Sequence, residues 1–286
     1  MSYLRRSSPL HAARASIAAG YCAALVLAAL LTNQPLILGA VGLATALAAA
    51  GAGVGRRVAR SLYFSVPMVV LVVVVNALVS RNGLTVLARF GGWGPFGQVD
   101  PTLEAVCYGA VIGLELAVIV AVCALASATV DPDEVLRSLR RVSFSSALTA
   151  SLATRMVPLL AADAGRIGEA QRSRVHGASR AAIMRAITTN ALDRALDVAA
   201  TLEVRGYGAA RRPPRIARPV SRHDAAFGAA GGLIAVLALL AAVFRLAAFR
   251  FYPTVSGRFG ATQFLVAAAF VVLAVAPFLE RRGTQR

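Results

Sequence analysis

Two short arginine-centred motifs are the residues of this chain best suited to specific recognition. The first is Arg172-Ser173-Arg174-Val175 and the second is Val204-Arg205-Gly206, and each stands at the end of a segment with helix-like spacing. A guanidinium group can bind a carboxylate through two parallel hydrogen bonds. Small neighbours such as Ser173 and Gly206 let another surface approach the backbone. The motifs therefore indicate a docking platform for another protein.

Carboxylates form two groupings, which are Asp131-Pro132-Asp133-Glu134 and the pair of Asp193 and Asp197. A membrane-embedded prenyl or phospholipid transferase would use such groups to hold a divalent metal ion and a diphosphate. Helix capping explains the first grouping, because Asp131 suits an N-cap and Pro132 the first helical position. Solvated pairing explains the second. The transferase is therefore the alternative function.

The remaining polar residues give no catalytic pattern. The sequence contains no lysine and so no Gly-x-x-x-x-Gly-Lys phosphate loop. His11, His176 and His223 are isolated, and neither a metal site nor a cofactor is expected. Glu115 lies near the middle of an apolar stretch, where a structural polar contact and a proton or cation relay are both open interpretations.

The composition is that of a membrane protein. Hydrophobic residues make up 58% of the 286 residues and charged residues 15%, with a net charge of +17, and the mean hydropathy is +0.68. Soluble domains are nearer half apolar and a quarter charged. The arginines flank apolar spans without interleaved aromatic residues, which argues against nucleic-acid binding.

Six stretches are long and apolar enough to approach the roughly 20 residues of a membrane span. They are Ile17 to Leu31, Leu36 to Val54, Tyr63 to Val79, Leu103 to Ala128, Ala225 to Phe244 and Gln263 to Leu279. The sequence therefore predicts an all-α polytopic membrane protein of about six transmembrane helices. It divides into a membrane region at 1–130 with four helices, an arginine-rich cytoplasmic module at 131–222 and a membrane region at 223–286 with two helices.

Arginine distribution predicts the orientation, because short cytoplasmic loops carry the excess of positive charge. One side receives the N-terminus, the loop that follows the second span, the module at 131–222 and the C-terminal tail. These segments contain Arg5, Arg6, Arg14, Arg56, Arg57, Arg60, Arg281, Arg282 and Arg286, and 16 of the 30 basic residues lie between Arg137 and Arg222. We expect a multi-pass protein of the cell membrane with both termini in the cytoplasm.

Three amphipathic helices are predicted in the module. The first runs from Asp131 to about Arg141. The second runs from Ser143 to about Val175, contains Pro158 and has an apolar face of Leu148, Leu152, Met156, Leu159, Leu160 and Ile167. The third runs from about Ser179 to Leu202, with Ile183, Ile187, Leu192, Leu196, Ala199 and Leu202 facing inward, and ends at Gly206 and Gly208.

Three runs in this module resemble a known family. They are Arg155-Met-Val-Pro-Leu-Leu, Ile167-Gly-Glu-Ala-Gln-Arg-Ser-Arg174 and Arg194-Ala-Leu-Asp-Val-Ala-Ala-Thr-Leu-Glu-Val-Arg-Gly-Tyr-Gly208. Together they resemble the transmembrane T component of energy-coupling factor (ECF) transporters, also known as the cobalt-transport permease type. The resemblance covers about Val130 to Gly208, and the membrane spans agree in number and order.

The resemblance implies a subunit of an ATP-driven importer of vitamins or transition-metal ions. Its partners would be a pair of cytoplasmic ABC-type ATPases, a small membrane subunit that binds the substrate, and the lipid bilayer. The helices of the module would be coupling helices, and ATP hydrolysis would take place in the partners, so the chain itself would be no enzyme. An ordinary ABC importer permease would instead present one short coupling helix.

The family's two arginine motifs insert into grooves on the ATPases. By position, Arg174 with Ser173 and Val175 matches the first motif, and Arg205 with Val204 and Gly206 matches the second. The family's first motif usually has Ala before the arginine and Gly or Ser after it. The chain departs from that pattern, so Arg172 is an alternative to Arg174 as the first docking residue.

Overall fold

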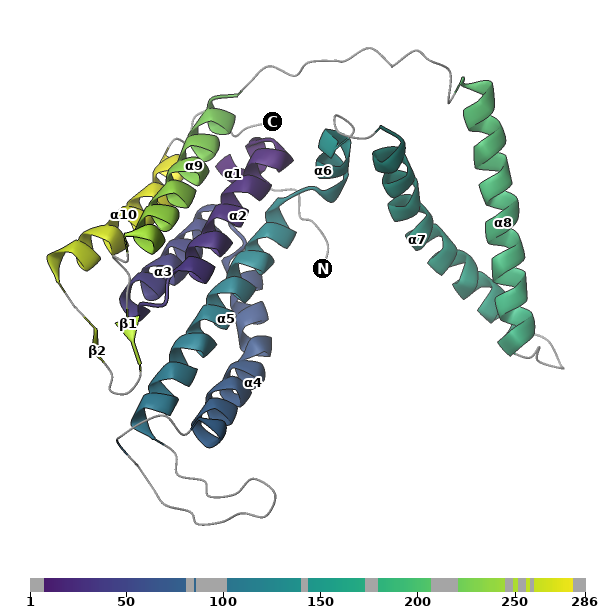
Figure 1. The fold of residues 1–286 in the computed structure, drawn as a ribbon. Helices are drawn as coiled ribbons and strands as arrows, with labels where there is room; N and C mark the ends of the chain where they lie inside the picture. The colour runs from purple at the N-terminus through teal and green to yellow at the C-terminus, as the bar shows by residue number, and fades with distance from the viewer. Residues whose placement is uncertain are drawn as a thin grey trace. The chain divides into compact units, whose positions relative to one another are not determined.

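The computed structural model describes residues 8–80, 85, 102–139, 144–172, 180–206, 221–244, 249–251, 256–257 and 260–279. The chain divides into two compact units (Figure 1). One unit, here called the bundle, comprises residues 1–135 and 220–286, and the other, here called the hairpin, comprises residues 136–219. The described residues are overwhelmingly helical, which confirms the predicted all-α class.

The bundle contains most of the apolar sequence. Its elements are α1 (Pro9–Ala12), α2 (Ala15–Leu31), α3 (Pro35–Gly51), α4 (Gly55–Val79), α5 (Leu103–Thr129), α9 (Arg222–Val243), β1 (Phe249–Arg250), β2 (Ser256–Gly257) and α10 (Ala261–Leu279). Four of these helices, α4, α5, α9 and α10, are long and apolar enough to cross a membrane. The apolar helices α2 and α3 have 17 residues each, at the lower end of the range for a span. The protein is therefore a polytopic membrane protein.

Helix α4 begins earlier than the sequence suggested. Arg56, Arg57 and Arg60 were predicted in a loop, but they occupy the first turns of α4, which starts at Gly55. The left-handed Gly53 (φ 71°) separates α3 from α4, so the chain turns within a few residues and continues as helix. Most side chains of α4 are exposed within this chain, including Tyr63 and Phe64, as expected for a helix facing lipid.

Aromatic side chains from three helices form the centre of the bundle. The rings of Tyr21 on α2 and Phe227 on α9 meet edge to face at 5.4 Å, and Phe227 meets Phe278 of α10 in the same way at 5.1 Å. The Tyr21 hydroxyl donates a 2.9 Å hydrogen bond to the carbonyl oxygen of Ala274 on α10. A buried tyrosine therefore satisfies its polar end inside an apolar core.

Small residues allow neighbouring helices of the bundle to approach closely. A Cβ atom added at Gly231 of α9 would lie 3.1 Å from the Cα atom of Tyr21, and one added at Gly109 of α5 would lie 3.1 Å from the Cα atom of Val73 on α4. Membrane helices associate largely through such close contacts, because lipid offers little hydrophobic driving force. A two-stranded ribbon, β1 with β2, lies between α9 and α10 in the chain, with Phe249 paired to Gly257.

Candidate functional site

The hairpin consists mainly of two long helices, and both arginine motifs follow them. Helix α6 (Pro132–Leu139) leads from the bundle into this unit, α7 extends over Phe144–Arg172 and α8 over Arg180–Val204. These three helices lie where the sequence predicted them, within a few residues at each end. Pro158 lies inside α7, as expected.

The second arginine motif is an exposed tip. Val204 is the last residue of α8 and is 89% exposed, and Arg205 and Gly206 beyond it are exposed as well. The Arg205 N–H donates to the carbonyl oxygen of Thr201, and the Gly206 N–H donates to that of Glu203. Gly206 adopts φ 75°, a left-handed conformation that favours glycine at a helix end. The helix therefore stops at Val204 and leaves the Arg205 guanidinium at its tip.

The first motif lies at the junction of the two helices. Arg172 is the last residue of α7, and Ser173, Arg174 and Val175 lie outside the described residues. The choice between Arg172 and Arg174 is therefore still a sequence-based prediction.

In the sequence, α8 lies between the two motifs. Helix α8 begins eight residues after Arg172 and ends one residue before Arg205. Its 25 residues give it a length of about 37 Å at roughly 1.5 Å per residue. The second motif is thus separated from the first by the whole length of this helix in the sequence.

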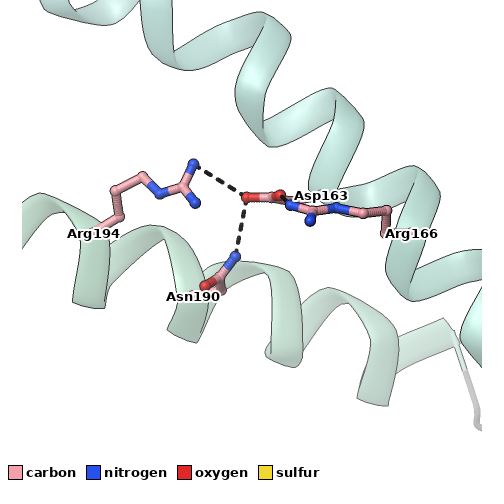
Figure 2. A network of polar contacts seen from close by, with 4 residues as sticks. All are labelled: Asp163, Arg166, Asn190 and Arg194. Carbon is pink, nitrogen blue, oxygen red and sulfur yellow. Dashed lines mark hydrogen bonds and ion pairs between the residues drawn. The ribbon is translucent and has the colours of Figure 1, made fainter.

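A buried carboxylate joins α7 to α8 (Figure 2). The side chain of Asp163 on α7 is only 3% exposed. Asn190 of α8 donates its amide N–H to Asp163 Oδ2 at 3.2 Å, and Arg194 Nη1 of α8 lies 3.3 Å from the same oxygen. Arg166, one turn further along α7, pairs with the other oxygen, Oδ1. We call these four residues the Asp163 cluster.

The cluster keeps its carboxylate ionised. The hydrogen bond from Arg166, together with the charges of Arg194 and Arg166 and the hydrogen bond from Asn190, holds the pKa of Asp163 below its usual value, although burial acts in the opposite direction. A buried charge is tolerated only when it is paired and hydrogen-bonded. The cluster meets this condition with partners from both helices.

The cluster also corrects the predicted inward face of α8. Ile183, Ile187 and Leu202 are half-buried, as expected, but Leu192, Leu196 and Ala199 are exposed, and Leu159 of α7 is exposed too. At about 100° per residue, positions two apart lie on nearly opposite sides of a helix. Because Asn190 and Arg194 face Asp163, Leu192 and Leu196 are turned outward, each 61% exposed.

Helix α5 carries two acidic residues, Glu104 and Glu115, and their surroundings differ. Glu104 is buried in the first turn of α5 and accepts hydrogen bonds from the backbone N–H and the hydroxyl of Thr85, the latter at 2.8 Å. Glu115 is half-buried further along α5. Within the described residues, no group of three or more His, Cys, Asp or Glu side chains is arranged to hold a metal ion.

Comparison with known families agrees with this architecture. The model of the family CbiQ, described as cobalt transport protein, matches residues 6–215. The chain belongs to the CbiQ family. No curated protein matches it. The match extends from before α1 to beyond α8 and includes both arginine motifs, so the chain is a membrane component of a transport system.

The Asp163 cluster of this CbiQ-family chain was missed in the sequence. Its signal was present, because Asp163 lies 13 residues before position 176 and Asn190 lies 14 residues after it. Such positions face each other in a helical hairpin whose helices are joined near position 176. An acidic residue flanked by alanines on α7 and a polar pair spaced by four on α8 complete the pattern.

Proposed function

We propose that this chain is the transmembrane coupling subunit of an ECF-type, ATP-driven importer of vitamins or transition-metal ions. One observation carries the proposal: the Val204-Arg205-Gly206 motif is an exposed tip of α8 in a helical hairpin that follows membrane helices in the chain. The other arginine motif precedes the same helix in the sequence. Membership of the CbiQ family supports a role in transport.

In this proposal each arginine motif docks on one of two cytoplasmic ABC-type ATPase subunits. Arg205 with Val204 and Gly206 forms one contact, and Arg174 or Arg172 with Ser173 and Val175 forms the other. The guanidinium groups bind carboxylates in grooves of the ATPases, where pairs shielded from water are strongest. The chain itself hydrolyses nothing, and its partners supply the chemical energy.

ATP binding draws the two ATPase subunits together and moves the two docked ends relative to each other. The hairpin passes this movement to a small substrate-binding membrane subunit that lies against it. This mechanism requires a protein of the cell membrane whose hairpin lies on the cytoplasmic side, where the ATPases are. The arginine distribution predicts that side for the hairpin and for both termini.

The test compares charge reversal at the motifs with the same change at another arginine of α8. Arg205→Glu and Arg174→Glu place a carboxylate where the partner is expected to have one, and the loss of such a buried pair costs about 2–5 kcal/mol. Arg185→Glu is the matched control, because Arg185 is an exposed residue of α8 that belongs to neither motif.

The measurement is co-purification of the ATPase pair from detergent-solubilised native membranes, together with substrate uptake by cells. We expect Arg205→Glu to lose both while the protein still inserts into the membrane, and Arg185→Glu to keep both. Normal uptake by Arg205→Glu, or a wild-type chain that retains no ATPase, would overturn the proposal.

A further inference from the structure

Within the part of the hairpin whose burial the structure describes, Asp163 is the buried polar side chain. Asp163 is the buried centre of contacts from both helices (Figure 2), whereas Arg166, which pairs with it, is 73% exposed. Most residues of α7 and α8 are exposed or half-buried, so apolar packing between these helices is limited. The Asp163 cluster is therefore a specific cross-link in an otherwise lightly packed pair of helices.

The position of the cluster along the hairpin matters for the transfer of movement. Asp163 lies nine residues before Arg172, about 14 Å along α7, and Asn190 lies fifteen residues before Arg205, about 22 Å along α8. Pro158 lies five residues before Asp163 and removes one backbone hydrogen bond from α7. A helix is most easily bent at such a proline, so the cross-link holds α7 just beyond its weakest point.

We infer that Asp163 is a positioning residue that fixes the crossing of α7 and α8, so that a movement at one arginine motif is transmitted to the other helix rather than absorbed by sliding. This inference rests on the proposed coupling function. The Asp163 carboxylate acts through Asn190 and Arg194, which it holds on α8.

Three variants of the full chain test this, each assembled with its ATPase pair and substrate-binding subunit in lipid vesicles. Asp163→Asn keeps the size of the side chain but removes the charge that pairs with two arginines. Asp163→Glu restores the charge. Asp193→Asn is the control, because Asp193 is an exposed carboxylate of α8 outside the cluster. The readouts are ATPase co-purification, ATP hydrolysis, substrate uptake and the distance between spin labels placed on exposed positions of the helices, Ala170→Cys and Thr201→Cys.

We expect Asp163→Asn to retain the ATPase pair and ATP hydrolysis but to lower uptake per ATP by about tenfold, a typical size for a perturbed coupling. The distribution of label distances should broaden. Asp163→Glu should recover much of the uptake and the narrow distribution, and Asp193→Asn should resemble the wild type.

Two outcomes would overturn the inference while leaving the docking role intact. One is uptake and label distances in Asp163→Asn equal to the wild type. The other is loss of the ATPase pair in Asp163→Asn, which would make the residue a support for docking rather than for transmission. A wild-type chain that binds no ATPase would instead defeat the proposed function, and the inference with it.

Discussion

Arg14, just before α2, is bound to Asp224 in the first turn of α9, although 210 residues separate them. The Arg14 backbone N–H donates to Asp224 Oδ1 at 2.7 Å, and its Nε lies 3.2 Å from Oδ2. The same Oδ2 accepts a hydrogen bond from the backbone N–H of Ser221, which completes a capping box. One buried carboxylate therefore caps α9 and joins it to the start of α2.

Replacing this carboxylate should destabilise the bundle. Asp224→Ala removes a helix cap and leaves the backbone N–H groups of Arg14 and Ser221 without their acceptor. We expect a loss of about 2–4 kcal/mol in the free energy of unfolding. Thermal unfolding in detergent measures the change. Asp197→Ala, at an exposed position of α8, is the control and should change little. Equal melting temperatures for the two variants would refute a structural role for Asp224.

The contact between α4 and α5 depends on two glycines of α5. A methyl group at Gly109 would meet the Cα and carbonyl oxygen of Val73 at 3.1 and 3.2 Å, whereas one at Gly113 would meet the Val69 side chain at 3.0 Å. A side chain can move more easily than backbone. Gly109→Ala should therefore cost about 1–3 kcal/mol and Gly113→Ala less.

Gly20→Ala on α2 is the matched control for these two changes, because nothing lies within 4 Å of a Cβ atom placed there. It should be neutral or slightly stabilising, since alanine favours helix more than glycine does. Unfolding of the purified variants in one detergent gives the ranking. The packing of α4 on α5 would be misassigned if Gly20→Ala were the most harmful of the three.

The Asp163 cluster should weaken in acid. The pKa of Asp163 is lowered in the folded chain, chiefly by the hydrogen bond from Arg166, so its stabilising effect is complete above the unfolded pKa, near 3.9. The effect is lost as pH falls through the lower folded pKa. The stability difference between wild type and Asp163→Asn should thus be constant from about pH 7 to pH 5 and shrink below about pH 4. A difference that grows as the pH falls would contradict this.

Much of the fold follows from local features of the sequence. The apolar stretches predicted the helices of the bundle. Asp131 and Pro132 predicted where α6 begins, and Gly206 predicted where α8 ends, because capping and backbone preferences act within a few residues. The family resemblance rested on the same segment and is confirmed by the CbiQ match. The docking roles of Arg174 and Arg205 stay predictions, because they concern surfaces of other chains.

The side of α8 that faces α7 could not be predicted from apolar spacing alone. Several stripes on α8 contain apolar residues, so spacing admitted Leu192 and Leu196 as inward residues. A tertiary contact, that of Asn190 and Arg194 with Asp163, selects another stripe. The result is a half-buried Ile187 and an exposed Leu192 on the same helix.

This difference gives a direct test of the helix orientation in the hairpin. Ile187→Asp places a charge at a half-buried position of α8 and should destabilise the hairpin by about 1–3 kcal/mol, whereas Leu192→Asp should stay within about 0.5 kcal/mol of the wild type. Limited proteolysis of the full chain in detergent reports the opening of the hairpin for both variants under identical conditions. Faster cleavage of Leu192→Asp than of Ile187→Asp would instead support the inward face of α8 that apolar spacing predicted, with Leu192 toward α7. The expected order, with only Ile187→Asp cleaved faster than the wild type, follows from the Asp163 cluster turning Leu192 away from α7.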